Sequence, residues 1–516
     1  FTGGKNNVSH SPAFKERTFL IPDHLVDEFL ENDIETLAKL YTKSVAPEVA
    51  MLKKFGSLDM RKEFAAIESR FQANMNKPGV DGKKELAVRD RNMKDLETAR
   101  DRLLNRRGLP DDPTTWVHRT SHAARTLNYI RLLGGMTVSA FPDMARPVQV
   151  HGMINTFNDG LLPLITQLKR SRLLFDEMEN LGLVSEMISN NRMQAAADIM
   201  DDTIRGNMAE RALGVASDTF GKVSLMAPWN QAWKQLAGAV SMARLLRAIE
   251  ADVLGNISAK ERTNLRAATV SHEMSKRISQ QVALHKADGE GLILPNVLAW
   301  TDKNAASNFQ AAVGRDIDRT IVTPGLDKPS MADSGEVGKH LFAFKSFAFA
   351  ATSRILLSGL QQSDMAAMNG LVLSVALGML TASTKLSLAG RGDELEDWTV
   401  EKALVAGIDR SGSIGIIADL HNITEKVTGF GANQFTGMSS EKYASRNPTG
   451  AVLGPSSGLL ADMLRALGAG GTDGFSGADL HAIRKILPYQ NLFYARWMFD
   501  NMESGLVDAL GLKPRK

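Results

Sequence analysis

The sequence predicts an all-α protein, an extended multi-helix and multi-subdomain architecture with few or no strands. Apolar residues recur at intervals of three and four over much of the 516-residue chain, which is the spacing of one helix face. Long alternating runs rich in β-branched residues are not found, so strands should be minor. Proline and glycine clusters divide the chain into many helical stretches. We therefore expect about two-thirds or more of the residues to be helical, well above the usual share.

Composition shifts divide the chain into six expected segments. They are an extended arm (1–22), a charged N-terminal helical region (23–110), a central helical domain (111–320), a loop plus an apolar helical hairpin (321–400), a Gly-rich interrupted region (401–476) and a C-terminal aromatic and basic helical unit (477–516). The sequence LPDDP at 109–113 is the clearest boundary. Within the central domain, Ser258 is expected to open one helix that continues through Ile278.

Residues 339–388 are the stretch around which the chain is expected to be organised. From Met365 to Thr384 no side chain is charged, and this run of about 20 residues matches the length that a helix needs to cross a bilayer. A turn at Ser363 and Asp364 separates it from the apolar residues that precede it. A hairpin of buried core helices in a large soluble protein and a membrane segment both fit this pattern.

Small side chains recur at every fourth position of the uncharged run. They are Ala366, Gly370, Ser374, Gly378 and Ala382. In a helix these residues form one stripe, which lets two helix backbones approach closely, as helices do inside membranes. We therefore predict a helix-packing or membrane stripe at these positions.

The C-terminal unit holds a second group of candidate site residues. Aromatic and basic residues gather there in a chain with only 6% aromatics, and the candidates are Arg484, Lys485, Tyr489, Tyr494, Arg496 and Trp497. Such a cluster suits an interface with a partner, with lipid headgroups or with single-stranded nucleic acid. A helix pair docked against the body of the protein is the alternative interpretation.

Several classes of function lack support in the sequence. The net charge of +3 gives no argument for bulk nucleic-acid binding, and the lack of cysteine excludes disulfides, thiolate zinc sites and cysteine nucleophiles. The phosphate-binding loop, the Gly-x-Ser-x-Gly turn and the His-Glu-x-x-His motif are not found. We therefore expect no enzymatic activity, no metal and no cofactor in this chain. A longer parent with an enzymatic domain before Phe1 stays open.

Three passages resemble one protein family. They are DRTIVTPGLDKP (318–329), followed by FKSF (344–347) and LQQ (360–362); LGGMTVSAFPD (133–143); and LPYQNLFY (487–494). These passages are similar to the C-terminal region of very large internal virion proteins, also called ejection proteins, of tailed and mostly short-tailed bacteriophages. The resemblance covers roughly residues 115–510, and its motifs are structural rather than catalytic.

The resemblance implies a structural role in genome delivery. Such a protein would assemble as a homo-oligomer, with other internal virion proteins and with portal or tail proteins, in a capsid core or an envelope-spanning conduit. It would lie inside the capsid of the virion and in the host cell envelope after ejection, with phage DNA and the host inner membrane as further candidate partners. Two alternatives stay open: a DNA-organising virion protein, and a non-catalytic part of a large virion enzyme that degrades peptidoglycan or carries a polymerase.

Overall fold

The computed structural model confirms the predicted fold class. It describes residues 34–104, 106–108, 115–181, 208–287, 293–321, 329–332, 334–362, 364–415, 417, 420–421, 424–425, 428, 454–468 and 474–513. Of these described residues 79% are helical and none lies in a strand. The arm expected at residues 1–22 lies outside the described residues. The chain divides into two compact units: unit 1 is 1–118 with 329–338, and unit 2 is 119–328 with 339–516.

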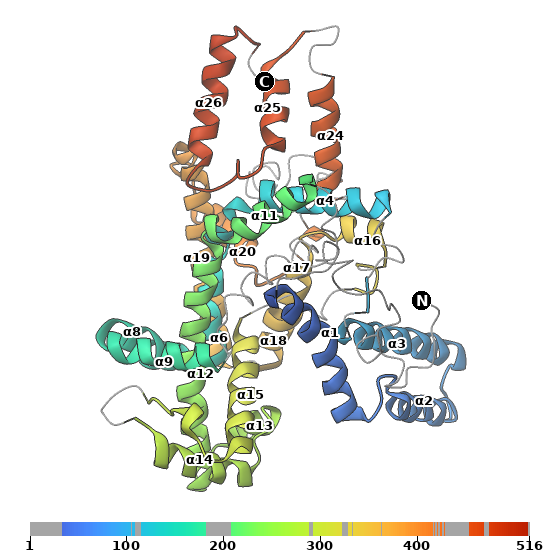
Figure 1. Ribbon diagram of the computed structural model, residues 1–516, viewed down its shortest axis with the longest axis vertical. Coiled ribbons are helices and arrows are strands. Elements are labelled where there is room, and N and C mark those ends of the chain that lie inside the picture. The colour runs from blue at the N-terminus through green and yellow to red at the C-terminus, as the bar shows by residue number, and fades with distance from the viewer. Residues whose placement is uncertain are drawn as a thin grey trace, which may run out of the picture. The chain divides into compact units, whose positions relative to one another are not determined.

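Unit 1 contains three helices of the charged N-terminal region (Figure 1). These are α1 (Ile34–Phe55), α2 (Arg61–Met75) and α3 (Gly82–Leu103). The Asp81 carboxylate caps α3 by accepting hydrogen bonds from the backbone N–H groups of Lys83 and Lys84, at 3.1 and 3.4 Å. Met51, Leu58 and Leu104 form a small hydrophobic core in this unit. Most of α2 and α3 faces solvent.

Unit 2 contains the remaining helices, and α4 and α16 cross the unit boundaries along the chain. The first eleven are α4 (Trp116–Leu132), α5 (Met136–Ser139), α6 (Arg146–His151), α7 (Met153–Thr156), α8 (Leu162–Thr166), α9 (Leu168–Asn180), α11 (Met208–Val223), α12 (Met226–Val253), α13 (Ala259–Ala267), α14 (His272–His285) and α15 (Lys303–Thr320). The others are α16 (Glu336–Leu341), α17 (Ser346–Ala351), α18 (Ser358–Gln362), α19 (Met365–Leu388), α20 (Val400–Arg410), α24 (Pro455–Leu467), α25 (Gly477–Ile486) and α26 (Arg496–Ala509). Short 3-10 turns lie at η5 (Leu133–Gly135), η6 (Phe141–Ala145), η8 (Val297–Ala299) and η10 (Gly392–Leu395), and π-helical turns at η7 (Phe157–Leu161) and η9 (Thr352–Leu357).

The larger core of unit 2 forms around α12, its longest helix. α9, α13, α14 and α15 pack along α12 (Figure 1). Trp300 and Phe309 are fully buried in this core, with ring centroids 5.3 Å apart, and Met178 and Ile278 fill the space beside them. This packing makes α12 and α15 a rigid support for the elements described below.

A second core joins α4, α11 and the loop before α26. Tyr129 and Phe220 are buried with their rings edge to face, 4.9 Å between centroids, and burial raises the pKa of Tyr129. Leu492 packs into the same cluster, and the backbone N–H of Tyr489 donates to the carbonyl of Ile130 at 3.0 Å. The C-terminal helices are thus attached to the body of unit 2.

Candidate functional site

The uncharged run forms most of one 24-residue helix, α19, whose last turn also contains Lys385. It begins at the expected turn, where the Asp364 carboxylate accepts a hydrogen bond from the backbone N–H of Ala367 at 2.8 Å. A hydrogen bond from Lys260 holds the pKa of this carboxyl below its usual value. The helix stops at Leu388, two residues before Gly390, whose φ of 69° lies in the left-handed region that glycine tolerates.

The small-residue stripe lies on the inner side of α19. Gly370, Ser374, Gly378 and Ala382 are buried, and Ala366 is half-buried. A Cβ atom added to Gly370 would lie 2.5 Å from the Cα of Gln149 in α6. One added to Gly378 would lie 2.1 Å from the carbonyl oxygen of Gly407 in α20. Both distances are far shorter than a carbon contact, so only glycine permits this packing.

The partner of α19 differs from the one expected for the hairpin at 339–388. α19 packs mainly on η6, on α6 and on α20, the helix that follows it; α18 is its main contact from the preceding segment. Small residues also recur four apart on α20 and directly after its end, at Ala403, Gly407 and Ser411. The Ser374 and Ser413 hydroxyls share a buried hydrogen bond of 2.7 Å. Two facing rows of small residues bring α19 and α20 together, which the larger side chains of 342–349 could not do.

The other side of α19, which we call the outer face, carries large apolar side chains that stay exposed. They are Met365, Met368, Leu371, Val372 and Leu380, with exposed fractions of 43% to 68%. Within the described ranges α19 is the one helix long and apolar enough to be a candidate membrane span, with a mean hydropathy of 1.7 in its most apolar window and 33% of that window buried. Core helices of soluble proteins meet the same criterion.

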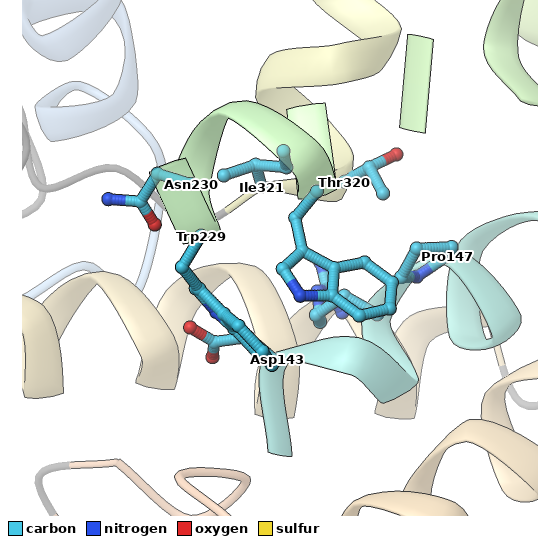
Figure 2. Close-up of a pocket in the computed structure, with 8 residues that line it drawn as sticks. Asp143, Pro147, Trp229, Asn230, Thr320 and Ile321 are labelled. Carbon is cyan, nitrogen blue, oxygen red and sulfur yellow. The ribbon is translucent and has the colours of Figure 1, made fainter. Parts of the chain in front are cut away.

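A small pocket lies beside the elements that support α19. Figure 2 shows Trp229, Asn230, Thr320, Ile321, Asp143 and Pro147 around it, and Trp233 and Arg146 complete the lining. The rings of Trp229 and Trp233 lie 5.7 Å apart, one helical turn from each other on α12. The hydroxyl of Thr320 donates to the carbonyl of Asp316 at 2.8 Å. The pocket thus has two aromatic rings among polar and apolar side chains, and its one hydroxyl has a structural partner.

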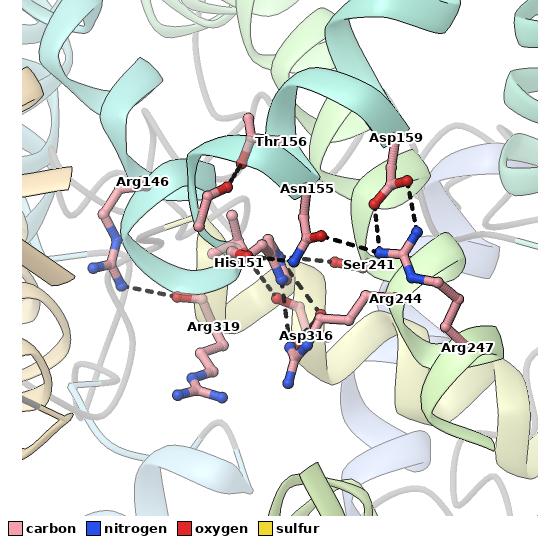
Figure 3. A network of polar contacts seen from close by, with 12 residues as sticks. Arg146, His151, Asn155, Thr156, Asp159, Ser241, Arg244, Arg247, Asp316 and Arg319 are labelled. Carbon is pink, nitrogen blue, oxygen red and sulfur yellow. Dashed lines mark hydrogen bonds and ion pairs between the residues drawn. The ribbon is translucent and has the colours of Figure 1, made fainter. Parts of the chain in front are cut away.

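Arg146 is a buried cation of α6, one of the helices on which α19 packs, and Figure 3 shows its contact with Arg319. Its guanidinium donates to the carbonyl oxygens of Arg319 and Arg354, at 3.0 and 2.9 Å, and to the side-chain oxygen of Gln149 at 2.5 Å. Burial lowers the pKa of Arg146 to about 10. These bonds join α6 to α15 and η9. They also hold Gln149, the residue that Gly370 of α19 contacts, in its position.

His151 extends the polar network into the core (Figure 3). Its Nε2 lies 3.0 Å from the Thr320 hydroxyl, whose own proton goes to a backbone carbonyl, so Nε2–H donates to this oxygen. Nδ1 then accepts from Arg244 at 3.4 Å, and Arg244 also pairs with Asp316 at 3.2 Å. Burial lowers the pKa of His151 to about 4. The ring is therefore neutral at pH 7 and serves as a structural link among α6, α12 and α15.

This polar network supports the inner side of α19. The inner side of the helix contacts Gln149, which accepts a hydrogen bond from the buried Arg146. α19 thus has one packed side and one open apolar side.

The three basic candidates of the C-terminal unit each pair with acids of the same chain. Arg484 contacts Asp500 at 2.5 Å and Glu503 at 2.7 Å. Lys485 pairs with Asp462 at 2.7 Å, and Arg496 lies 3.7 Å from Asp500. These contacts reduce the positive charge that the cluster presents to a phosphate backbone.

The aromatic candidates divide into two groups. The phenol groups of Tyr489 and Tyr494 donate to the carbonyl oxygens of Ala216 and Val223 in α11, each at 2.8 Å. These two residues dock the C-terminal segment on the body, as the alternative interpretation expected. Trp497 is 72% exposed on α26, so it remains available to a partner.

Sequence reasoning missed Arg146, Gln149, His151 and Gly407. The row of Ala403, Gly407 and Ser411 has the same four-residue spacing as the stripe on α19 and was a readable signal. Arg146 and His151 carried no such signal, because their partners are distant in sequence. Within the described ranges, no three His, Asp or Glu side chains gather as a metal site.

Comparison of the chain with protein-family models, with curated proteins and with solved structures finds no match. Its function is therefore argued from the geometry above and from the resemblance of its sequence motifs.

Proposed function

We propose that this chain is a structural internal virion, or ejection, protein. It assembles with copies of itself and with other virion proteins, in a capsid core or in a conduit for genome delivery through the host envelope. The outer face of α19 is the observation that carries this proposal, because a soluble monomer rarely leaves so continuous an apolar surface open. The sequence motifs that resemble ejection proteins supply the biological setting.

The surroundings of the outer face support assembly. α20 adds exposed Val400, Leu404 and Ile408, spaced four residues apart along one side of that helix. Behind α19, the glycine contacts and the network around Arg146 hold the helix in place. A rigid helix that presents apolar side chains outward loses little conformational entropy when it binds a partner.

The distribution of polar groups favours assembly over the alternatives. Arg146 and His151 are bound by structural hydrogen bonds, and the basic residues of the C-terminal unit are paired with carboxylates. Neither group presents a reactive pair or an open cationic surface. Among the described residues these groups favour a role that depends on surfaces, and DNA organisation has less support than self-assembly.

A pair of matched variants tests the role of the outer face. Val372 on α19 and Val215 on α11 are both 67% exposed, so aspartate costs each helix a similar amount. We expect Val372→Asp to abolish or reduce assembly of the full chain, measured by light scattering after gel filtration. Val215→Asp should assemble like the wild type, and both should retain its circular-dichroism spectrum. Equal assembly by both variants would remove the support that α19 gives to the proposal.

The location of the protein tests the biological setting. An antibody against the chain should detect it in purified particles only after the capsids are opened. After infection, the same antibody should find it in the host envelope fraction. Detection on the outside of intact particles, or only in the host cytoplasm, would contradict a role as an ejection protein.

A further inference from the structure

α26 leaves a row of apolar side chains open to solvent. None of its residues is buried. Its side toward α25 is mixed: Asp500 and Glu503 bind Arg484, Glu503 also lies 2.9 Å from Nδ1 of His481, and the half-buried Phe499 and Val507 lie one helical turn before and after Glu503. A surface helix normally turns its apolar side chains to the core. α26 turns only these two inward, and its remaining large apolar side chains are open to a partner.

The open residues of α26 form a regular row, which we call the α26 row. Its members are Met498, Met502, Leu506 and Leu510, four residues apart and 46% to 59% exposed. The backbone N–H of Gly477, at the start of α25, donates to the carbonyl of Lys513 at 3.0 Å. This bond ties the residues after α26 back to α25, so the row is fixed at both ends.

A second apolar row lies on α24, at the other edge of the same layer. α24 packs on α25 and α25 packs on α26, and Figure 1 shows the three helices side by side. The α24 row consists of Leu460, Met463, Leu464 and Leu467, which are 37% to 84% exposed. On its other side, α24 buries Leu459 and Asp462. The layer therefore has one open apolar row on each of its two edge helices.

We infer that the α24 row of one copy binds the α26 row of the next copy, in a head-to-tail contact. This inference rests on the proposed function and names the surface through which the chain would assemble. Every copy carries both halves of such a contact, and a contact between two different surfaces builds rings or filaments rather than closed dimers.

The exposed area of the two rows is sufficient for a specific contact. With about 200 Å² for a fully exposed leucine or methionine, the eight side chains expose roughly 900 Å², and an interface with 60% apolar area would then reach about 1,500 Å². Stable protein interfaces bury about 1,200–2,000 Å².

The charges of α26 favour a protein partner over an anionic membrane. From Arg496 to Leu510 the chain has one basic residue and three acids, Asp500, Glu503 and Asp508. Helices that bind anionic lipid surfaces are rich in lysine and arginine on their polar side. The α26 row has the apolar side of such a helix without the basic residues, which suits a second copy of the chain.

The cysteine-free chain allows a direct test. Leu464→Cys and Met502→Cys each introduce one thiol into a row, and a short bismaleimide then joins thiols that lie close together. We expect covalent dimers when the two variants are mixed, and few when either is treated alone. Val215→Cys mixed with Met502→Cys is the control and should give few dimers. Circular dichroism and melting temperature show that each variant is folded.

Each outcome decides between the inference and the proposed function. Efficient cross-linking of either variant with itself would show a symmetric contact and overturn the head-to-tail arrangement. If the chain assembles in light scattering but the mixed variants do not cross-link, the inference fails and the proposed function stands. If the chain stays monomeric at all concentrations and no pair cross-links, both fail.

Discussion

Gly378→Ala tests whether α19 packs on α20 through direct backbone contact. The added methyl carbon would lie 2.1 Å from the carbonyl oxygen of Gly407 and 3.0 Å from its carbonyl carbon. Carbon atoms in favourable contact are about 3.5–4.0 Å from their neighbours. Because the obstructing atoms belong to the backbone, no side-chain rotation relieves the clash, and the two helices must separate.

The expected loss follows from two opposing terms. Overpacking in a filled site costs about 1–3 kcal/mol, and a clash with backbone belongs at the upper end of this range. Alanine recovers about 1 kcal/mol of helix propensity relative to glycine. We therefore expect Gly378→Ala to lower the free energy of unfolding by about 2 kcal/mol. Gly214→Ala in α11 is the control, because an added Cβ there meets nothing within 4 Å. It should stabilise the protein by about 0.5–1 kcal/mol.

Urea titration of the full chain, followed by far-UV circular dichroism, measures both variants. Gly378→Ala should shift the transition of unit 2 to lower urea, and Gly214→Ala should leave it unchanged or shift it to higher urea. If Gly378→Ala stabilises the protein as much as the control, the close approach of α19 and α20 does not exist.

Three further predictions concern charged and titrating groups. Burial holds the pKa of His151 near 4, against about 6.5 in an unfolded chain, so the unfolded state takes up a proton first. Stability therefore falls as the pH drops from 6.5 to 4, and the free energy of unfolding of the wild type should fall by about 1.5 kcal/mol between pH 6.5 and 5. Urea midpoints should show a smaller loss for His151→Asn, and an equal loss would contradict the assignment. Arg484→Gln removes the guanidinium that joins both Asp500 and Glu503 to α25, which costs roughly 1–3 kcal/mol, so amide hydrogen exchange in α26 should accelerate about tenfold or more while α14 is unchanged. Duplex DNA should bind weakly, with a shallow salt dependence that reflects few phosphate contacts; tight binding with a steep salt slope would favour the DNA-organising alternative.

Local sequence signals predicted the fold class and several helix ends. Ser258 caps α13 through a hydrogen bond to the backbone N–H of Glu261, and Asp364 caps α19 at the expected turn. Caps depend on residues within one turn, which a sequence displays directly. The single helix expected from Ser258 through Ile278 was wrong, because α13 and α14 are separated at Thr269, which adopts a φ of 65°. A threonine in a sequence gives no signal that its backbone adopts a left-handed conformation.

The partners of the candidate site residues lay beyond local signals. The spacing of Gly370 and Gly378 predicted a close helix contact. It could not identify Gln149 and Gly407 as the residues that these glycines contact. The basic residues of the C-terminal unit looked available to a ligand, whereas Arg484 is bound to acids one helix away. Pairings between distant segments follow from the packing of the whole unit, which periodicity does not contain.

The two sides of α19 should tolerate amino-acid replacement very differently. On the inner side, Gly370 and Gly378 lie against backbone atoms of Gln149 and Gly407. Nearly every substitution there should therefore separate α19 from α6 or α20. On the outer side, Met368 and Val372 contact little of their own chain, and the fold itself places few demands on them. A library of single variants screened only for folding should therefore accept many residues at positions 368 and 372. If the outer face binds a partner, as proposed, the same library selected for assembly of the chain should accept fewer residues at these two positions. The comparison would then distinguish residues that the fold requires from residues that only the partner requires.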